Sequence, residues 1–309
     1  MMNDVSNRPV CDYEGSRYQT EFWEQGGREY EDRVERIALK HLLPENGTLC
    51  LEIGAGAGRL TDLLDRFERV ILLDYSRTQL QQAQARLGNH GRFTYVVADI
   101  YGLPFVAGLF DAAMMVRVIH HLVDPRAALT GIRATLRPHG ALVLEFANKR
   151  NAKAIMRYWL GQQSWNPFSP EPVEFSKLNF NFHPRGMRSW LHEVGFTIGQ
   201  QRSISHFRMP VLKRIVPLDW LTAADVRLQP SGGHLQLTPS VMLRADAGLS
   251  GPIAAAHTFF RCPQCASTEL TENESELTCP NCGRICIIRD VIYDFKEPQK
   301  SLLKKGAEA

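Results

Sequence analysis

The sequence predicts an α/β fold with a parallel sheet covered by helices on both faces, followed by a small unit built around cysteines. Two observations predict the sheet. Short apolar segments alternate with helical patterns from residue 49 onward, and these segments are apolar on both faces, as buried parallel strands are. The third observation is that five of the seven cysteines fall within residues 262–286. A chain of 309 residues is long enough for one large domain and a small one.

Composition and the first residues narrow the class of protein. Hydrophobic residues make up 44% of the chain and charged residues 22%, as in globular proteins. No apolar run approaches the roughly 18 residues of a membrane-spanning helix, and the N-terminus lacks the apolar core of a secretory signal. Paired Cys-x-x-Cys spacing without an export signal indicates metal binding in a reducing compartment, so we expect a cytoplasmic protein. The net charge of +3 excludes no class of partner.

The elements are expected in a regular order. An N-terminal arm leads into a helix over 31–44, which has apolar residues at helical spacing and ends at Pro44. Strands and helices then alternate, with strands over 49–53, 69–74, 93–99, 110–118 and 141–147 and helices over 58–67, 76–88 and 124–136. The last of these helices should end at Pro138-His139-Gly140. A helix over 183–195 and strands over 196–204 and 239–245 complete the sheet.

These elements suggest a division of the chain. We expect an arm and helix over 1–46, a catalytic domain over 47–246, a linker over 247–258, a cysteine-rich unit over 259–297 and a tail over 298–309. Two stretches of the catalytic domain, 148–182 and 205–238, exceed a minimal sheet and are expected to be insertions on the substrate side.

Three glycines mark a corner between the first strand and the segment after it. The segment Leu-Glu-Ile-Gly-Ala-Gly-Ala-Gly over 51–58 places Gly54, Gly56 and Gly58 where the chain turns. Glycine allows positive φ and lets a ligand approach the backbone, so this corner predicts a ligand site. A dinucleotide fingerprint would need glycine at position 59, which is Arg59, and the Gly-Lys-Ser/Thr of a phosphate-binding loop is absent.

Three carboxylates indicate which ligand fits. Asp74 ends the second strand, where an acid can bind both hydroxyls of a ribose. Asp99 ends the third strand, where a carboxylate can reach the exocyclic amine of an adenine. Glu52 would lie beside a cationic amine. The predicted ligand is an adenosine that carries an amino acid and no phosphate.

The motifs LEIGAGAG, ILLDYS, VVAD, FDAAMMVRVIHHL and LRPHGALVLEF, in this order, resemble those of class I S-adenosylmethionine-dependent methyltransferases, particularly the ubiquinone-biosynthesis-like group. The resemblance covers about residues 47–204. It implies a Rossmann-like seven-stranded sheet of order 3-2-1-4-5-7-6 whose last strand is antiparallel. It also implies S-adenosylmethionine as the cofactor, bound by Glu52, Gly54, Ala55, Gly56, Gly58, Asp74, Tyr75, Asp99, Ile100, Arg117 and Tyr18. The N-terminal segment resembles the arm that folds over the cofactor in this family, so Tyr13, Tyr18 and Trp23 are expected to close the pocket.

Methyl transfer from a sulfonium is an in-line displacement, so positioning supplies much of the catalysis and a base is needed only where the nucleophile carries a proton. His120 and His121 follow the fourth strand and are expected to face the transfer site. One of them could be this base; the other interpretation is that they shape the pocket or cap the next segment. Motifs typical of amino-methylation of adenine or glutamine amides and of cytosine carbon-5 methylation are absent. An oxygen, nitrogen or carbon acceptor therefore remains open.

The substrate-side segment 149–214 is distinctive in charge. It holds 11 Lys or Arg residues against three acids, Glu171, Glu174 and Glu193, together with ten aromatic residues. Cations interleaved with aromatics suit an anionic, planar or apolar acceptor, RNA included. The other interpretation is a helical lid whose aromatics belong to the core and whose charges are solvated.

The cysteines have the spacing of a zinc ribbon. Cys262 and Cys265 are followed, after thirteen residues, by Cys279 and Cys282. Two such knuckles supply four thiolates to a tetrahedral structural zinc and leave no open position for catalysis. A short segment cannot bury enough core to fold alone, so the metal should supply stability. Cys286 is then surplus and is expected to be a buried thiol.

The end of the ribbon, CPNCGRICIIRDVIYDF, resembles the small zinc-ribbon activator proteins of tRNA, rRNA and release-factor methyltransferases. It departs from their pattern where Cys286 replaces an aromatic residue and Val-Ile-Tyr at 291–293 replaces Gly-Ile-Pro. Residues 259–296 carry four Lys or Arg against six Asp or Glu, which suits phosphate poorly. We expect the ribbon to bind a protein partner or to pack on its own catalytic domain.

These inferences predict an enzyme that transfers a methyl group from S-adenosylmethionine to an unspecified acceptor, a small molecule, RNA or protein. One alternative is a catalytically silent scaffold that binds the cofactor and engages a partner through the ribbon. A second is an RNA methyltransferase with a fused activator-like ribbon.

Overall fold

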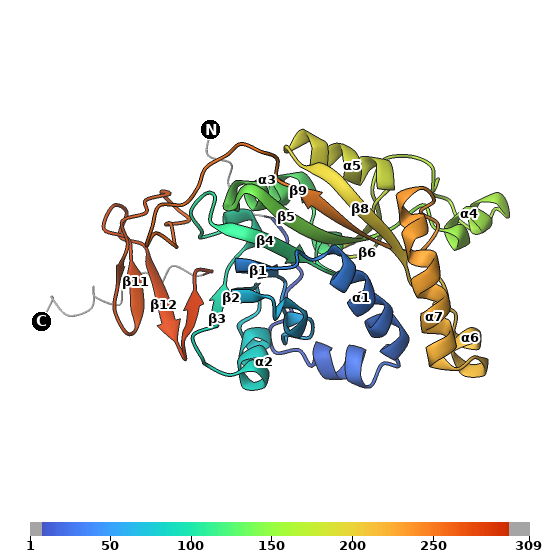
Figure 1. The fold of residues 1–309 in the computed structure, drawn as a ribbon, viewed down its shortest axis with the longest axis horizontal. Coiled ribbons are helices and arrows are strands. Elements are labelled where there is room, and N and C mark those ends of the chain that lie inside the picture. The colour runs from blue at the N-terminus through green and yellow to red at the C-terminus, as the bar shows by residue number, and fades with distance from the viewer. Residues whose placement is uncertain (1–7, 297–309) are drawn as a thin grey trace, which may run out of the picture.

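The computed structural model of the chain describes residues 8–296 and shows a twisted sheet with helices on both faces (Figure 1). Seven strands follow the order β3-β2-β1-β4-β5-β9-β8, which confirms the predicted order, with β8 and β9 as the sixth and seventh strands. β9 is antiparallel to both neighbours, also as predicted. These strands are β1 Gly47–Ile53, β2 Phe67–Asp74, β3 Phe93–Val97, β4 Phe110–Met115, β5 Leu136–Ala147, β8 Thr197–Ile204 and β9 Ser240–Asp246.

The helices divide between the two faces of the sheet. α3 and α5 contribute to a core cluster on one face, and α1 and α2 contribute to a second cluster on the other. Local signals fix the helix starts: Ser76 Oγ accepts a hydrogen bond from Gln79 N at 3.2 Å, and Asp124 Oδ1 accepts one from Ala127 N at 3.0 Å. The helices are α1 Glu29–Leu42, α2 Arg77–Leu87, α3 Pro125–Thr135, α4 Ala152–Trp159, α5 Pro184–Glu193, α6 Pro210–Ile215 and α7 Leu218–Leu228.

The register brings the carboxyl ends of three strands level. Ile53 of β1 pairs with Leu73 of β2 on one side and with Met115 of β4 on the other. The loops after these strands therefore meet at one edge of the sheet, where α/β proteins bind ligands.

Two expected elements differ in the structure. The helix expected over 58–67 is only a 3₁₀ turn, Thr61–Leu64, because β2 begins at Phe67 and leaves room for a single turn. The break expected at 138–140 belongs instead to strand β5, which begins at Leu136. The β4–β5 ladder absorbs this segment through an irregular register between Phe110 and Ala112, so the turn residues become a bulge within the strand.

The cysteine-rich unit continues the sheet. Its strands are β10 Thr271–Glu272, β11 Glu276–Thr278, β12 Ile285–Arg289 and β13 Ile292–Asp294. They pair antiparallel in sequence order, and β13 then pairs parallel with β3, with Ile292 opposite Tyr95 and Asp294 opposite Val97. Of the two interpretations of the ribbon, this geometry shows packing on its own catalytic domain (Figure 1).

Backbone hydrogen bonds hold the segment between β9 and the ribbon against the domain. His139 N donates to Gly248 O at 2.8 Å, and Ala254 N donates to Gly108 O at 3.0 Å. Gly108 has a φ of +68°, and a Cβ there would lie 2.0 Å from the carbonyl oxygen of Pro252. The stretch expected to be a linker therefore runs close along the domain surface. The expected tail, 298–309, lies outside the described residues.

The insertions form the end of the molecule opposite the ribbon (Figure 1). The first contains α4 and the hairpin of β6 Val173–Ser176 and β7 Asn179–Asn181; the second contains α6 and α7. α7 packs on α1, where Tyr30 Oη donates to Asp225 Oδ2 at 2.6 Å. Among residues 8–296, no helix is long and apolar enough to cross a membrane.

Candidate cofactor and acceptor site

A pocket lies at the carboxyl ends of β1 to β4, beneath the N-terminal arm. Most of the predicted cofactor residues line it: Glu52, Gly54, Ala55, Gly56, Asp74, Tyr75, Asp99, Ile100, Arg117 and Tyr18. Gly58 does not line it. With a φ of +71° and Leu87 of α2 only 2.9 Å from where a Cβ would stand, Gly58 allows the corner to pack on α2.

Three carboxylates from three strand ends face the pocket. Asp74 Oδ2 accepts from Gly56 N, and its Oδ1 accepts from Ser76 N, both at 2.8 Å. Asp99 Oδ1 accepts from Tyr101 N at 2.9 Å. These backbone bonds orient the two aspartates at the strand ends where they were predicted.

Glu52 is the most deeply buried of the three carboxylates, with 4% of its surface exposed. Burial raises the pKa of Glu52 to about 7, and the hydrogen bond from Thr61 Oγ1 to Glu52 Oε2, at 2.6 Å, opposes this shift. Burial destabilises the ionised form of this carboxylate in the free protein, and a cationic ligand bound beside it would stabilise that form.

The two arginines that line the pocket already have partners. Glu35 of α1 is fully buried and bonds both: Arg59 Nη2 lies 2.8 Å from Glu35 Oε2, and Arg117 Nε lies 2.7 Å from Glu35 Oε1. Although burial raises the pKa of Glu35, the two guanidiniums hold it below the usual value. No motif marks Glu35, because it reaches the site from a helix that precedes the glycine corner, so sequence reasoning missed it.

Three aromatic residues of the N-terminal arm, Tyr13, Tyr18 and Trp23, line the pocket that the arm is expected to close. The centre of the Trp23 ring lies 3.5 Å from the Cζ of Arg59 and 4.8 Å from that of Arg117, so the ring contacts both guanidiniums. Besides these aromatics, the arm contributes four residues that the sequence did not single out for the pocket: Pro9, Val10, Cys11 and Gln19.

The two predicted histidines take different positions. His121 lines the pocket and His120 does not. His121 Nδ1 lies 2.9 Å from Leu178 O, which can only accept, so Nδ1 carries the hydrogen. Its Nε2 therefore has the free lone pair and accepts from Tyr13 Oη at 3.3 Å. Burial lowers the pKa of His121, which keeps this nitrogen unprotonated at neutral pH.

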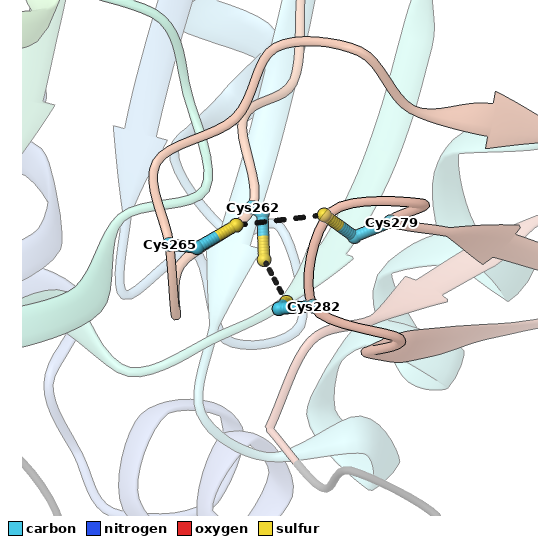
Figure 2. A group of neighbouring side chains, drawn as sticks. All are labelled: Cys262, Cys265, Cys279 and Cys282. Carbon is cyan, nitrogen blue, oxygen red and sulfur yellow. Dashed lines mark hydrogen bonds between the residues drawn. The ribbon is translucent and has the colours of Figure 1, made fainter.

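The four predicted zinc ligands converge at the base of the ribbon (Figure 2). The sulfurs of Cys262 and Cys282 lie 3.5 Å apart, as do those of Cys265 and Cys279, and all four lie within 4.8 Å of one another. A tetrahedral zinc with Zn–S bonds of about 2.3 Å requires sulfurs about 3.8 Å apart, so the group fits zinc. Cys286 is buried away from them, in the core cluster on the α3 and α5 face.

The ribbon also touches the cofactor side of the domain. Lys296 Nζ donates to Tyr75 O at 3.4 Å and lies 4.4 Å from the centre of the Tyr75 ring. At α2, Arg77 Nη2 donates to Arg289 O at 2.7 Å. One residue of the pocket lining, Tyr75, is thus held partly by the ribbon.

The methyltransferase-domain family matches residues 51–144, which contain the glycine corner and strands β2 to β4. Within residues 51–144 the chain is thus similar to methyltransferase domains. The demethylmenaquinone methyltransferase of Clavibacter sepedonicus is 26% identical over 186 residues, 56% of this chain and 76% of that protein. The O-methyltransferase cnsE of Penicillium expansum is 28% identical over 151 residues, 46% of this chain and 55% of that protein. The chain spans from about a third to three quarters of the length of these and similar relatives.

Solved structures show the same fold. One chain from the complex of the Haloferax volcanii Trm112 methyltransferase activator with a methyltransferase superposes with a TM-score of 0.52 and 18% identity. The match covers 75% of this chain and 96% of that chain. At this identity the likeness concerns the fold of the methyltransferase domain.

Proposed function

We propose that the protein transfers a methyl group from S-adenosylmethionine to an oxygen, nitrogen or carbon of an acceptor. The observation that carries this proposal is the charge of the pocket. Three carboxylates line it, whereas both of its arginines are paired with Glu35. Such a pocket suits a cationic ligand without phosphate and disfavours a dinucleotide, whose pyrophosphate would have no free cation.

Different residues hold different parts of the cofactor. Asp74 binds the ribose hydroxyls, Asp99 and Ile100 frame the adenine, and Glu52 lies beside the cationic amine. When bound, the cofactor would supply a methyl group whose bond to a sulfonium breaks to release a neutral thioether. The arm would exclude water from this group. Tyr13, Tyr18 and Trp23 provide this cover.

His121 is the base where the acceptor carries a proton. His121 lines the pocket, where its Nε2 accepts from Tyr13 Oη, a bond that an acceptor's proton would replace. The bond from Nδ1 to Leu178 O fixes the tautomer and would stabilise the ring once protonated. His120 does not line the pocket, and in this proposal it shapes the turn that positions His121.

The ribbon holds a structural zinc through Cys262, Cys265, Cys279 and Cys282 and supports the cofactor side of the domain. β13 covers the β3 edge, and Lys296 reaches Tyr75. In this respect the ribbon does within one chain what a separate activator protein would do for its enzyme. Four clustered thiolates suit a reducing compartment, which supports a cytoplasmic location.

Calorimetric titration of the purified protein with S-adenosylmethionine and with NADH tests the choice of cofactor. We expect S-adenosylmethionine to bind at least about a hundredfold more tightly, because NADH would bring a pyrophosphate to three carboxylates. Equal affinity for the two compounds would refute the assignment. A protein that binds the cofactor but methylates nothing would instead be a scaffold.

A further inference from the structure

Four cationic side chains gather beside the hairpin that covers His121. Asn148 and Phe182 form a bridge at the end of β5, and Lys149 N donates to Phe182 O at 3.0 Å. Lys149 and Arg150 therefore lie next to His183, which caps the start of α5, and the first turns of α5 carry Arg185 and Arg188. We call Lys149, Arg150, Arg185 and Arg188 the cationic cluster.

The cluster has no directly ion-paired acid: among residues 8–296, none of its four groups forms an ion pair within 4.0 Å. Lys149 is the clearest case, because only 2% of its surface is exposed and its ammonium donates to neutral oxygens, Ser169 Oγ at 2.8 Å and Glu171 O at 2.5 Å. Arg188 Nη1 likewise donates to the neutral Gln236 Oε1 at 3.3 Å. Burial lowers the pKa of Lys149, and the charge of nearby Glu171 opposes this shift. Buried ammonium groups are rare in proteins unless they are paired.

Other cations of the same segment behave differently. Lys213 Nζ and Arg208 Nε lie 3.1 and 3.7 Å from the buried carboxylate of Glu31. The structure thus pairs some cations of the basic segment directly with an acid, whereas among residues 8–296 no member of the cluster has a carboxylate oxygen within 4.0 Å. Burial and then the four cations lower the pKa of His183 to about 4, so the histidine adds no negative or positive charge of its own.

The cluster lies on the acceptor side of the pocket. β8 is parallel to β5, because both are antiparallel to β9, so α5, which leads into β8, begins at the sheet edge that holds the pocket. The hairpin joins the two places directly: Leu178 O bonds His121, and His183 comes five residues later. The cluster and His121 therefore lie at the same edge of the sheet, joined by the hairpin.

We propose that the cationic cluster binds a phosphate monoester carried by the methyl acceptor. A dianion offsets four cations better than a single carboxylate does, and the guanidinium forks match phosphate oxygens in bidentate geometry. All four cations act on the same residue, His183, and come from one strand end and one helix start, which suits a single phosphate group better than a polymer. The role in acceptor binding rests on the proposed methyl transfer, whereas phosphate binding itself does not.

Calorimetric titration with inorganic phosphate, at low ionic strength and without S-adenosylmethionine, tests the site. We expect the double variant Arg185→Gln/Arg188→Gln to bind phosphate at least about tenfold more weakly than the unchanged protein. The matched control is Lys153→Gln/Arg157→Gln, which removes two exposed cations from α4 and should change the affinity less than about twofold. Lys149 is left in place because its burial makes a folding defect the expected result of replacing it.

A second readout monitors the His183 ring by NMR in the same samples. Bound phosphate should raise the pKa of His183 from about 4, because the anion offsets the surrounding cations. The proposal is overturned if phosphate does not bind, or if both double variants weaken binding equally, since the effect would then be net charge alone. It is also overturned if an RNA oligonucleotide without a terminal phosphate binds the cluster more tightly than phosphate. Because no cofactor is present, a failure here is separate from a failure of methyl transfer.

Discussion

Glu52 connects a strand residue to the charge of the ligand. It stands two positions before the first glycine of the corner, is buried, and its Oε2 accepts a hydrogen bond from Thr61 Oγ1 at 2.6 Å. In the proposed complex its carboxylate faces the amine of the cofactor. The affinity for a cationic ligand should therefore depend on whether Glu52 is ionised.

The pH dependence of cofactor binding tests this residue. The pKa of Glu52 is raised to about 7, so the acid is mostly neutral at pH 6 and ionised at pH 8. The affinity for S-adenosylmethionine should rise, by at most about tenfold per unit, between pH 5.5 and 7, where an amino group of ordinary pKa stays protonated. Calorimetry of Glu52→Gln should show a weak, nearly flat profile. A flat profile for the unchanged protein would remove Glu52 from the amine site.

Strand β13 shows what the ribbon contributes at the scale of an element. Ile292 is fully buried in the cluster on the α1 and α2 face, whereas its neighbour Val291 is 57% exposed. Both are β-branched residues beside the junction with β3. They therefore form a matched pair: replacing Ile292 tests packing on the catalytic domain, and replacing Val291 shows what a change within the ribbon does by itself.

The stability of this pair of variants checks the junction. Ile292→Ala should lower the free energy of unfolding by about 2–5 kcal/mol, as truncations in packed cores do. Val291→Ala should change it by less than about 0.5 kcal/mol, as surface substitutions usually do. Chemical denaturation measures both. Equal and small effects would mean that β13 does not pack on the domain.

The zinc knuckles form the second element of the ribbon. Replacing one thiolate should release most of the metal, because ligation and folding of the unit are coupled. We expect Cys279→Ser to lose zinc, measured by mass spectrometry, and to bind S-adenosylmethionine more weakly because the support of β3 and Tyr75 is lost. Cys286→Ser is the control and should keep one zinc per chain. A variant that lacks zinc but binds the cofactor with unchanged affinity would refute the coupling.

For the whole molecule, the sequence predicted the sheet well because its signals are local. Runs apolar on both faces, a capping Ser76 and glycines at the corner each act within a few residues, and the strand order came from the family resemblance. The spacing of Cys262, Cys265, Cys279 and Cys282 likewise predicted the four-thiol group.

The parts that the sequence did not predict depend on contacts between distant segments. Pairing of β13 with β3 joins residues 292–294 to 95–97, and no local pattern marks such a partner. The same holds for Glu35, which lies on α1 and pairs with Arg59 and Arg117 of the loops after β1 and β4. The charge of the pocket could therefore be judged only after the chain was folded.

Two variants of the protein, Asp74→Ala and His121→Gln, test the proposed methyl transfer. Asp74→Ala should lose most cofactor binding, since each hydrogen bond to a charged group contributes about 1.5–3 kcal/mol. His121→Gln should still bind the cofactor but transfer methyl about 10²–10⁴ times more slowly if its imidazole is the base. Unchanged transfer by His121→Gln would mean that the acceptor needs no base at this position.

Transfer itself is measured with tritium from methyl-labelled S-adenosylmethionine, added with the protein to an extract of cells that lack it and fractionated into RNA, protein and small molecules. We expect label in one fraction with the unchanged protein and none above background with Asp74→Ala. If the unchanged protein binds S-adenosylmethionine in calorimetry yet labels no fraction, the enzyme assignment is contradicted and the chain is a cofactor-binding scaffold.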